Sequence, residues 1–187
     1  MNSGYAKQQL RRKVASLKKD CPAELLAAFS DAIHARIEQS PLFRDAAHIV
    51  CYHALPGEVQ TVALLEKWYG QKRFFLPAVE GERLKFYPYH GENSLITGAF
   101  GIMEPRADGE ASAGDIDLAI VPGEAFDRRL NRLGKGRGFY DRFLAEFRKP
   151  VMGICFQFQL FDAVPIDGRD CKMTQIITER EIISASF

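Results

Sequence analysis

Residues 117–147 read DLAIVPGEAFDRRLNRLGKGRGFYDRFLAEF, and this stretch decides the fold. It begins with the short, nearly continuous apolar run 117–121, which is typical of a strand buried on both faces of a sheet. It ends with residues 140–147, where apolar side chains recur at helical spacing. A strand joined through a glycine-rich loop to a helix indicates the α/β class of fold.

The loop between these two elements combines glycine with positive charge. Gly134, Gly136 and Gly138 alternate with Lys135 and Arg137. Glycine lets a backbone turn sharply and approach a ligand closely, and the cations supply charge for an anion. The free N–H groups at the start of the following helix would point back at the loop. The segment therefore favours a phosphate-bearing ligand over a neutral one.

The glycine pattern by itself does not identify that ligand. No Gly-x-x-x-x-Gly-Lys-Ser/Thr run follows Gly134, and Phe139 stands where the third glycine of a dinucleotide fingerprint belongs. A charged loop that merely links a strand to a helix is the open alternative, because glycines mark loops whatever the loop does.

The rest of the chain repeats the alternation of helix and strand. Helices are expected over residues 4–19, 23–40, 61–68 and 140–147, with Thr61 as a cap, and strands over 46–53, 73–78, 84–89, 117–121, 151–156 and 175–178. This order predicts an α/β sandwich with a largely parallel sheet. Because ligand sites lie at the carboxyl ends of parallel strands, the loops after residues 53, 121 and 156 are expected to face one cleft.

Composition fits one domain over residues 1–187 and limits the classes of partner. The chain is 47% apolar and 26% charged, which is ordinary for a globular protein with a single core. Its net charge of +1 argues against a protein that mainly coats nucleic acid. Lys and Arg gather in residues 7–19 and 128–148, which indicates either a local anionic ligand or solvated helix faces.

The cysteines and the N-terminal segment indicate the compartment. Cys21, Cys51, Cys155 and Cys171 form no C-x-x-C pair and no zinc-ligand spacing. Cys51 and Cys155 lie in apolar runs, so we expect both to be buried thiols. The sequence contains no signal-peptide core and no apolar run of membrane-spanning length, so we expect a cytoplasmic protein without a membrane partner.

Several charged residues are candidates for ligand or metal binding. Asp141 and Asp170 could hold Mg²⁺, a cation that prefers oxygen ligands; alternatively, Asp141 pairs with an arginine and Asp170 caps a turn. Glu58 follows a Pro-Gly turn, which suits a side chain that projects into a cleft. Lys7 and Arg11 share one helix face and could clamp a triphosphate if that face borders the cleft.

Covalent catalysis is disfavoured, because no Ser-His-Asp or Cys-His constellation can be assembled from neighbouring segments. His53 could titrate near neutrality, although a lone histidine beside aromatics is more often structural. The aromatic residues are mostly core by pattern, and one or two could stack on a planar heterocycle.

The order of motifs resembles the 5-formyltetrahydrofolate cyclo-ligase family, also called methenyltetrahydrofolate synthetases. The resemblance covers nearly the whole chain. It is carried by Lys7-x-x-x-Arg11, Tyr52…Glu58-Val-Gln-Thr61, Gly101-Ile-x-Glu104-Pro105, Val121-Pro-Gly-x-Ala-Phe126-Asp127 and Arg132-Leu-Gly-Lys-Gly-Arg-Gly-Phe-Tyr140-Asp141.

The resemblance implies an enzyme that converts 5-formyltetrahydrofolate to 5,10-methenyltetrahydrofolate with ATP and Mg²⁺, releasing ADP and phosphate. ATP would phosphorylate the formyl oxygen, N10 would attack the activated carbon, and phosphate would leave. The protein would contribute positioning and charge stabilisation, with Lys135 and Arg137 as its catalytic cations. The implied fold is a three-layer α/β/α sandwich related to sugar-phosphate isomerases and coenzyme A transferases, and we expect a monomer.

The resemblance also implies residue roles, taken position by position. The ATP contacts would be Lys7, Arg11, Arg132, Leu133, Gly134, Lys135, Gly136, Arg137, Gly138, Phe139 and Tyr140. The folate contacts would be His53, Glu58, Lys135, Gly136, Arg137, Gly138 and Phe139, and the Mg²⁺ ligands Asp141 and Asp170. The chain departs from the family pattern at Phe139, where a tyrosine is usual, and at Arg169, where many members carry histidine.

Two other classes of function compete with this one. A sugar-phosphate isomerase or acyl transferase on a similar scaffold would need no ATP. A non-catalytic RNA-binding protein would use the basic clusters, but the near-neutral charge and the lack of an interleaved aromatic and basic platform count against it. Turnover that depends on ATP would exclude the isomerase or acyl transferase, and salt-sensitive binding of a polynucleotide would favour the RNA-binding protein.

Overall fold

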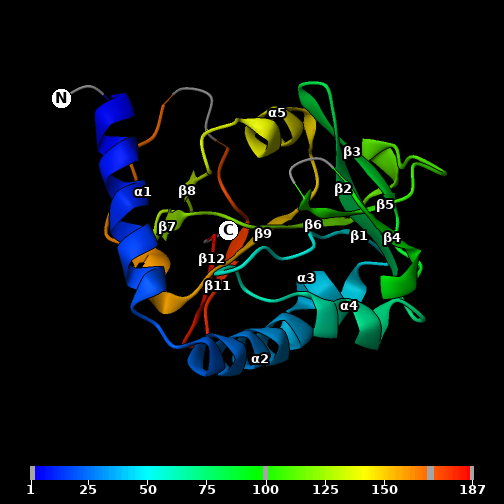
Figure 1. Ribbon diagram of the computed structural model, residues 1–187, viewed down its shortest axis with the longest axis horizontal. Coiled ribbons are helices and arrows are strands. Elements are labelled where there is room, and N and C mark those ends of the chain that lie inside the picture. The colour runs from blue at the N-terminus through cyan, green and yellow to red at the C-terminus, as the bar shows by residue number, and fades with distance from the viewer. Residues whose placement is uncertain (1–2, 99–100, 168–170, 186–187) are drawn as a thin grey trace.

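The computed structural model describes residues 3–98, 101–167 and 171–185 (Figure 1). A seven-stranded sheet forms its centre, in the order β12-β11-β9-β6-β1-β2-β3. The strands of this sheet are β1 (His48–Val50), β2 (Arg73–Glu80), β3 (Arg83–Pro88), β6 (Leu118–Val121), β9 (Val151–Ile154), β11 (Gln175–Ile177) and β12 (Ile182–Ser184).

The five inner strands run parallel. β11, β9, β6, β1 and β2 pair in parallel with their neighbours, whereas the outer strands β12 and β3 are antiparallel to theirs. The predicted α/β fold with a mostly parallel central sheet is therefore confirmed. Our interpretation of 175–178 as the last strand is wrong, because β12 follows and pairs with it across a short turn.

Alternating side chains of the inner strands build two cores. On β6, Leu118 and Ile120 enter one cluster of buried residues, while Ala119 and Val121 enter another. Successive side chains of a strand point to opposite faces, so a continuous apolar run is what a strand covered on both faces requires. The unbroken apolar run at 118–121 thus follows from the layers on either side of the sheet.

Helices cover both faces of this sheet (Figure 1). α2 (Ala23–Gln39), α3 (Pro41–Asp45) and α4 (Val62–Trp68) pack on the face of Leu118 and Ile120. α5 (Phe139–Glu146) packs on the opposite face, where the Phe143 ring lies 4.5 Å from that of Phe86. The relation to sugar-phosphate isomerases and coenzyme A transferases, and the single-domain boundary 1–187, stay predictions.

Smaller elements complete the structure. A three-stranded sheet contains β10 (Leu160–Phe161), β7 (Ala125–Asp127) and β8 (Arg132–Leu133), and a hairpin contains β4 (Leu95–Thr97) and β5 (Met103–Pro105). Short 3-10 turns are formed by Glu92–Ser94, Ala113–Asp115 and Gln157–Gln159. α1 (Ser3–Lys19) lies beside β7 and β8 at one side of the molecule (Figure 1). Among the described residues, no helix is long and apolar enough to cross a membrane.

The order of the parallel strands creates a switch point between β1 and β6. From β1 the chain passes through α4 to β2 on one side, whereas β6 lies on the other side of β1. The segments that leave the carboxyl ends of β1 and β6 therefore diverge, which opens a crevice above these two strands. This crevice is where a ligand site is expected in such a sheet.

Candidate active site

A cavity of about 320 Å³ lies at the carboxyl ends of β1 and β6. This volume falls within the range of small-molecule sites. The lining comes from the segments after β1 and β6, from β2, β3, β8 and the region of β5, from the glycine loop, and from the start of α5. It consists of Tyr52, His53, Leu55, Glu58, Pro77, Val79, Leu84, Ile102, Glu104, Pro122, Gly123, Arg132, Gly134, Lys135, Arg137, Gly138, Phe139, Tyr140 and Asp141.

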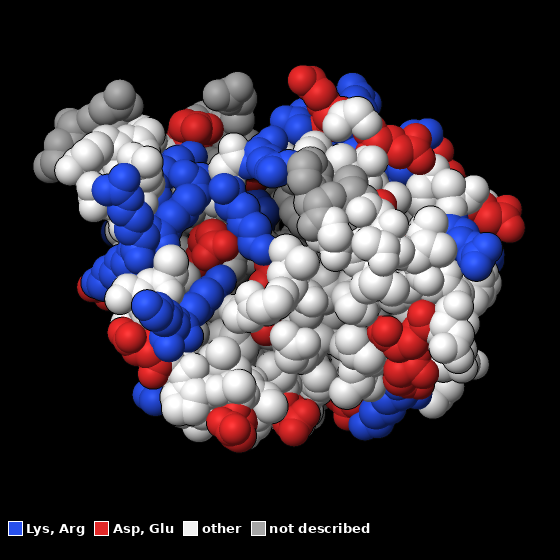
Figure 2. Space-filling model, in the orientation of Figure 1, with Lys and Arg blue, Asp and Glu red and all other residues white. Residues whose placement is uncertain are grey.

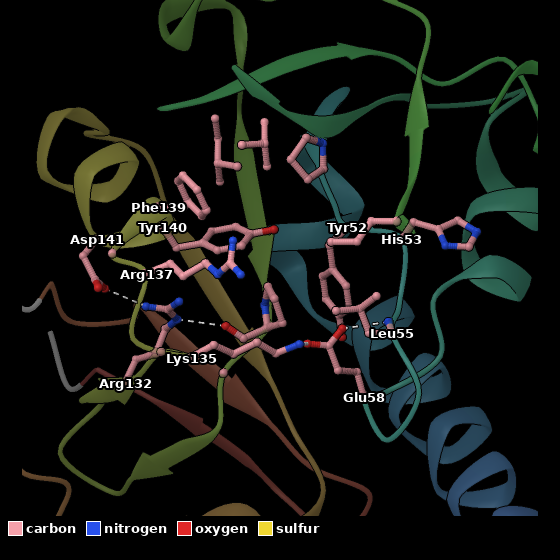
Figure 3. A pocket seen from close by; sticks show the side chains of 18 of the residues that line it. Tyr52, His53, Leu55, Glu58, Arg132, Lys135, Arg137, Phe139, Tyr140 and Asp141 are labelled. Carbon is pink, nitrogen blue, oxygen red and sulfur yellow. Dashed lines mark hydrogen bonds and ion pairs between the residues drawn. The ribbon is translucent and has the colours of Figure 1, made fainter. Parts of the chain in front are cut away.

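An ion pair between Glu58 and Lys135 joins the segment after β1 to the glycine loop across this cavity (Figure 3). The Lys135 Nζ atom lies 2.7 Å from Glu58 Oε1, and the backbone N–H of Leu55 donates to Glu58 Oε2 at 2.9 Å. The side chain of Glu58 is 6% exposed, and that of Lys135 is 43% exposed. The glutamate is thus fixed, while the lysine reaches it from the open side of the cavity.

α2 holds the segment that carries Glu58. The backbone N–H of Gln60 donates to Ser30 Oγ at 3.1 Å, and its carbonyl lies 2.6 Å from His34 Nε2. Burial lowers the pKa of His34, so this imidazole stays neutral near pH 7. The hydroxyl of Thr61 donates to the carbonyl of Tyr52 at 2.6 Å rather than capping α4, so the expected cap is wrong in chemistry although right in position.

The glycine loop has the backbone shape that its composition predicts. Gly136 has φ +102° and Gly138 has φ +71°, a region that other residues seldom enter. Gly138 precedes α5 directly, so the N-terminus of that helix opens onto the loop. This geometry turns Lys135 and Arg137 toward the cavity (Figure 3).

Arg132 is the most constrained cation of the site. Its Nε atom donates to the carbonyl of Pro122 at 2.8 Å, and its Nη1 atom donates to Asp141 Oδ1 at 2.8 Å. Its guanidinium also lies over the ring of Tyr140, 5.3 Å from the centroid. With a side chain only 5% exposed, it ties β6, β8 and α5 together beneath the cavity.

Three aromatic residues line the cavity beside these cations: Tyr52, Phe139 and Tyr140. Burial, and secondarily the charge of Glu58, raises the pKa of both Tyr52 and Tyr140 well above the usual value. Both phenols therefore remain neutral throughout the physiological range. Our interpretation of the aromatics as mostly core holds for Tyr52, whose hydroxyl donates to the carbonyl of Val59 at 3.0 Å.

α1 packs against the glycine loop. Arg11 Nε donates to the carbonyl of Gly134 at 2.9 Å, and Lys7 forms an ion pair with Asp167 at 3.0 Å. Arg11 therefore contacts the loop, although neither Lys7 nor Arg11 is among the residues that line the cavity. Figure 2 shows Lys and Arg side chains gathered over α1 and the adjoining loops. Through Arg11, the N-terminal basic cluster of the sequence meets the glycine loop of the second cluster.

The remaining predicted residues fall into three groups. His53 lines the cavity, and its Nε2 atom lies 3.1 Å from Glu92 Oε1. Leu133 turns its side chain into a small core cluster, so only its backbone faces the loop. Asp170 lies outside the described residues.

The cleft contains the predicted segments after β1 and β6, but the segment after residue 156 contributes none of the described lining residues, so that part of the prediction is wrong.

The residues of the site offer limited ligands for a metal ion. Asp141 pairs with Arg132, as the non-metal alternative expected, and its side chain remains 32% exposed at the cavity. Within residues 3–98, 101–167 and 171–185, no group of three or more His, Cys, Asp or Glu could hold a metal ion. Mg²⁺ commonly takes one or two carboxylates and completes its shell with phosphate oxygens and water. The donor set thus fits Mg²⁺ held largely by a phosphate ligand.

Sequence reasoning missed one whole side of the cavity. Pro77, Val79, Leu84 and Ile102 form an apolar surface there, together with the carboxylate of Glu104. The available signal was the segment Gly101-Ile-x-Glu104-Pro105, one of the motifs that carry the family resemblance. We call this surface the strand side, and the surface formed by Arg132, Lys135 and Arg137 the cationic side.

The fold and the cavity together define a class of protein. It is an α/β protein with a ligand site at the switch point of a parallel sheet, bounded by a cationic glycine loop and an apolar surface. Such a site suits a ligand with an anionic part and a flat, less polar part.

Comparison with known proteins identifies the family. The 5-formyltetrahydrofolate cyclo-ligase family matches residues 3–179. The 5-formyltetrahydrofolate cyclo-ligase of Haemophilus influenzae is 30% identical over 185 residues, covering 91% of this chain and 96% of that protein. A probable 5-formyltetrahydrofolate cyclo-ligase of Schizosaccharomyces pombe is 26% identical, covering 95% and 97%.

Solved structures agree. The NMR structure of 5,10-methenyltetrahydrofolate synthetase from Aquifex aeolicus has a TM-score of 0.87 and 32% identity, covering 95% of this chain and 92% of that one. The chain therefore belongs to the 5-formyltetrahydrofolate cyclo-ligase family and is an enzyme of that family. The resemblance found in the sequence is confirmed.

Proposed function

We propose that this enzyme converts 5-formyltetrahydrofolate to 5,10-methenyltetrahydrofolate at the expense of ATP, with Mg²⁺, releasing ADP and phosphate. The observation that carries the proposal is the ion pair between Lys135 and Glu58 across the cavity. This ion pair brings the glycine loop close to the segment after β1. A nucleotide bound at the loop would therefore meet a second substrate bound at that segment.

The chemistry follows from the substrate. A formyl amide oxygen is a poor leaving group, so the oxygen attacks the γ-phosphorus of ATP and ADP departs. N10 then attacks the formyl carbon, loses its proton, and expels the phosphorylated oxygen as inorganic phosphate. The methenyl bridge forms between N5 and N10. Because no protein nucleophile is needed, the absence of a covalent triad in the sequence agrees with this route.

The chain's own residues would act by position and charge. Lys135 and Arg137 are the catalytic cations of the proposal, since both line the cavity from the glycine loop where the γ-phosphate would lie. Arg132 keeps the loop in place through its bonds to Pro122 and Asp141. The loop backbone from Gly134 to Tyr140, with Arg11 and Lys7 behind it, would hold the rest of the nucleotide.

Mg²⁺ would neutralise charge on the phosphates, and Asp141 is the described carboxylate placed to hold it. Glu58 and His53 would contact the folate from the segment after β1, beside Phe139. Release of Lys135 from Glu58 would accompany ligand entry, because both groups would exchange one ion pair for contacts with substrate. The assignment of Asp170 to the metal stays a prediction.

Formation of the methenyl chromophore tests the proposal. Purified protein is mixed with 5-formyltetrahydrofolate, ATP and Mg²⁺, and absorbance is followed with each component omitted in turn. We expect turnover only in the complete mixture. Folded protein without turnover would rule out the proposed function, and turnover without ATP would favour an isomerase or acyl transferase instead.

The oligomeric state, compartment and partners of the enzyme are also proposals. We propose a monomer that acts in the cytoplasm on ATP and a reduced folate, with neither nucleic acid nor membrane as partner. Sedimentation of the full chain at several concentrations would test the monomer, and binding of a polynucleotide at low and high salt would test the absence of a nucleic-acid partner.

A further inference from the structure

Glu104 is a buried carboxylate in the cavity that the proposed chemistry leaves unused. It belongs to β5, is 8% exposed, and lines the strand side. Within the part of the chain that the structure describes, no cationic side chain forms an ion pair with it. Burying a carboxylate is costly unless hydrogen-bond donors reach it, so its presence here needs a partner.

The one protein donor that reaches Glu104 within the described chain is weak. The backbone N–H of Val79 donates to Oε1 at 3.3 Å, near the long limit for such a bond. The pairing of β2 with β1 ends at Phe75, and Val79 lies beyond that point on β2. A neutral amide side chain would satisfy that N–H equally well. Since a carboxylate can accept several hydrogen bonds, most of the acceptor capacity of Glu104 remains for a ligand.

The carboxylate is held in a fixed place. β4 and β5 pair with Ile96 opposite Glu104, which sets the direction of the side chain. Gly98 leaves the room it occupies, because a Cβ atom there would lie 2.0 Å from Glu104 Oε2. Such preorganisation is typical of a recognition group and lowers the cost of binding.

The surroundings of Glu104 define the ligand that it suits. Pro77, Val79, Leu84 and Ile102 give this side of the cavity an apolar surface. A flat heterocycle would lie well against these side chains. Two carboxylate oxygens match two adjacent N–H donors in a bidentate pair, an arrangement stronger than a single neutral bond.

We propose that Glu104 binds the aminopyrimidine edge of the substrate's reduced pterin ring, with the ring N–H and the exocyclic 2-amino group donating to its two oxygens. The proposal rests on the proposed function, since it names the part of the folate that this side holds. N5 belongs to the other ring of the pterin. Anchoring the pyrimidine edge at Glu104 therefore directs the formyl group away from β5, toward the cationic side.

Binding measurements on the full chain test this role without requiring turnover. Calorimetry of 5-formyltetrahydrofolate with wild type and Glu104→Gln should show Kd raised about 10- to 100-fold by loss of one charged hydrogen-bonding pair. ATP binding and Tm should stay unchanged. The matched control is Glu110→Gln, whose carboxylate is exposed and paired with Lys85, and its folate Kd should equal that of wild type.

A substrate analogue that lacks the 2-amino group separates recognition from structure. Wild type should bind this analogue about 10-fold more weakly than the parent compound, whereas Glu104→Gln should bind both nearly alike. Equal affinity of wild type for both compounds would overturn the proposal, even if Glu104→Gln failed to fold. A variant with lower Tm and equally weakened ATP and folate binding would likewise overturn it.

The two proposals fail in distinguishable ways. Wild type that binds the folate with the expected dependence on Glu104 but shows no turnover would leave the binding role standing and remove the reaction. Wild type that turns over and accepts the analogue equally well would remove only the role of Glu104. Wild type that binds no folate would remove both.

Discussion

Carboxylates lie at both ends of the parallel strands, but their partners differ in kind. At the amino end, Asp117 precedes β6 and accepts the backbone N–H groups of Ala47 and His48 at 3.0 and 2.9 Å. These hydrogen bonds lower the pKa of Asp117, and the bond from the His48 backbone contributes most. Backbone partners cannot be exchanged without unfolding, so this carboxylate serves to join β1 to β6.

At the carboxyl end, two carboxylates pair with cationic side chains. Glu58 faces Lys135 and Asp141 faces Arg132, at 2.7 and 2.8 Å, all four around the cavity. A side-chain cation can turn to a phosphate and leave its carboxylate to another ligand. The same residue types thus hold the fold at one end of the sheet and remain available to substrates at the other.

Among variants that test the difference between the two ends of the sheet, Lys135→Ala should cause the largest loss of activity. Loss of a cation aimed at the transferring phosphate should lower kcat/KM about 100- to 1000-fold, as removal of one stabilising donor does in other enzymes. The fold should persist, because the side chain is 43% exposed. Initial rates with varied ATP and a thermal melt give both quantities.

The control for this variant is Lys85→Ala, which removes another partly exposed lysine from ion pairs with Glu80 and Glu110. Its kinetics should match those of wild type. Unchanged kinetics in Lys135→Ala would exclude that residue from the site and would erase the functional difference between the two ends of the sheet.

Asp141→Asn should change the dependence on Mg²⁺. The amide keeps the shape of the side chain but loses the charge, so about 10-fold more Mg²⁺ should be needed for half-maximal rate. A Mg²⁺ titration of initial rate at saturating ATP measures this. Asp45→Asn, an exposed position at the end of α3, provides the control. If the titration curves of Asp141→Asn and wild type coincide, Asp141 does not hold the metal.

Gly138→Ala should show that the backbone of the loop matters as well as its charges. Its φ of +71° disfavours any Cβ, so the substitution should cost about 1–2 kcal/mol and lower Tm by about 2–8 °C. ATP affinity should fall as the loop shifts. Gly70→Ala is the control, because a Cβ there meets nothing within 4 Å and its φ is ordinary. Equal Tm values for the two variants would contradict the strain at Gly138.

The smallest effect should come from Asp117→Asn at the amino end. Because the folded pKa lies below the unfolded value near 4, the charged form stabilises the fold above that pH, and the contribution is lost as pH falls through the folded pKa. The variant should lose stability near pH 7 and depend less on pH below about 4. Partial exposure keeps the effect small. Denaturant unfolding at pH 7 and pH 3 measures it, and altered catalysis at pH 7 would contradict a purely structural role.

Local patterns were predictable because they depend on neighbours in the chain. The nearly continuous apolar run 117–121 gave the strand Leu118–Val121. The glycine loop has positive φ at Gly136 and Gly138, and residues 140–147 gave most of α5. Strand ends were less accurate: the strand expected over 46–53 is paired only over His48–Val50, because the chain then leaves the sheet to line the cavity.

Contacts between distant segments were not predictable in the same way. Spacing could not show that α1 lies on the glycine loop, although Arg11 bonds Gly134 there. Nor could it show that Glu104 enters the cavity, because its depth depends on the pairing of β4 with β5 and on contact with β2. Such placements arise from packing, which a linear pattern does not encode.

The sequence by itself determined the alternation of elements, the conformation of the glycine loop, the supply of cations and, through the order of its motifs, the family. Each of these follows from local stereochemistry or from residues read in order. Only the tertiary structure decided which carboxylate meets which cation and which strands close the cavity. The reason is physical: the switch between β1 and β6 brings together residues that lie far apart in the chain, and burial then fixes their partners.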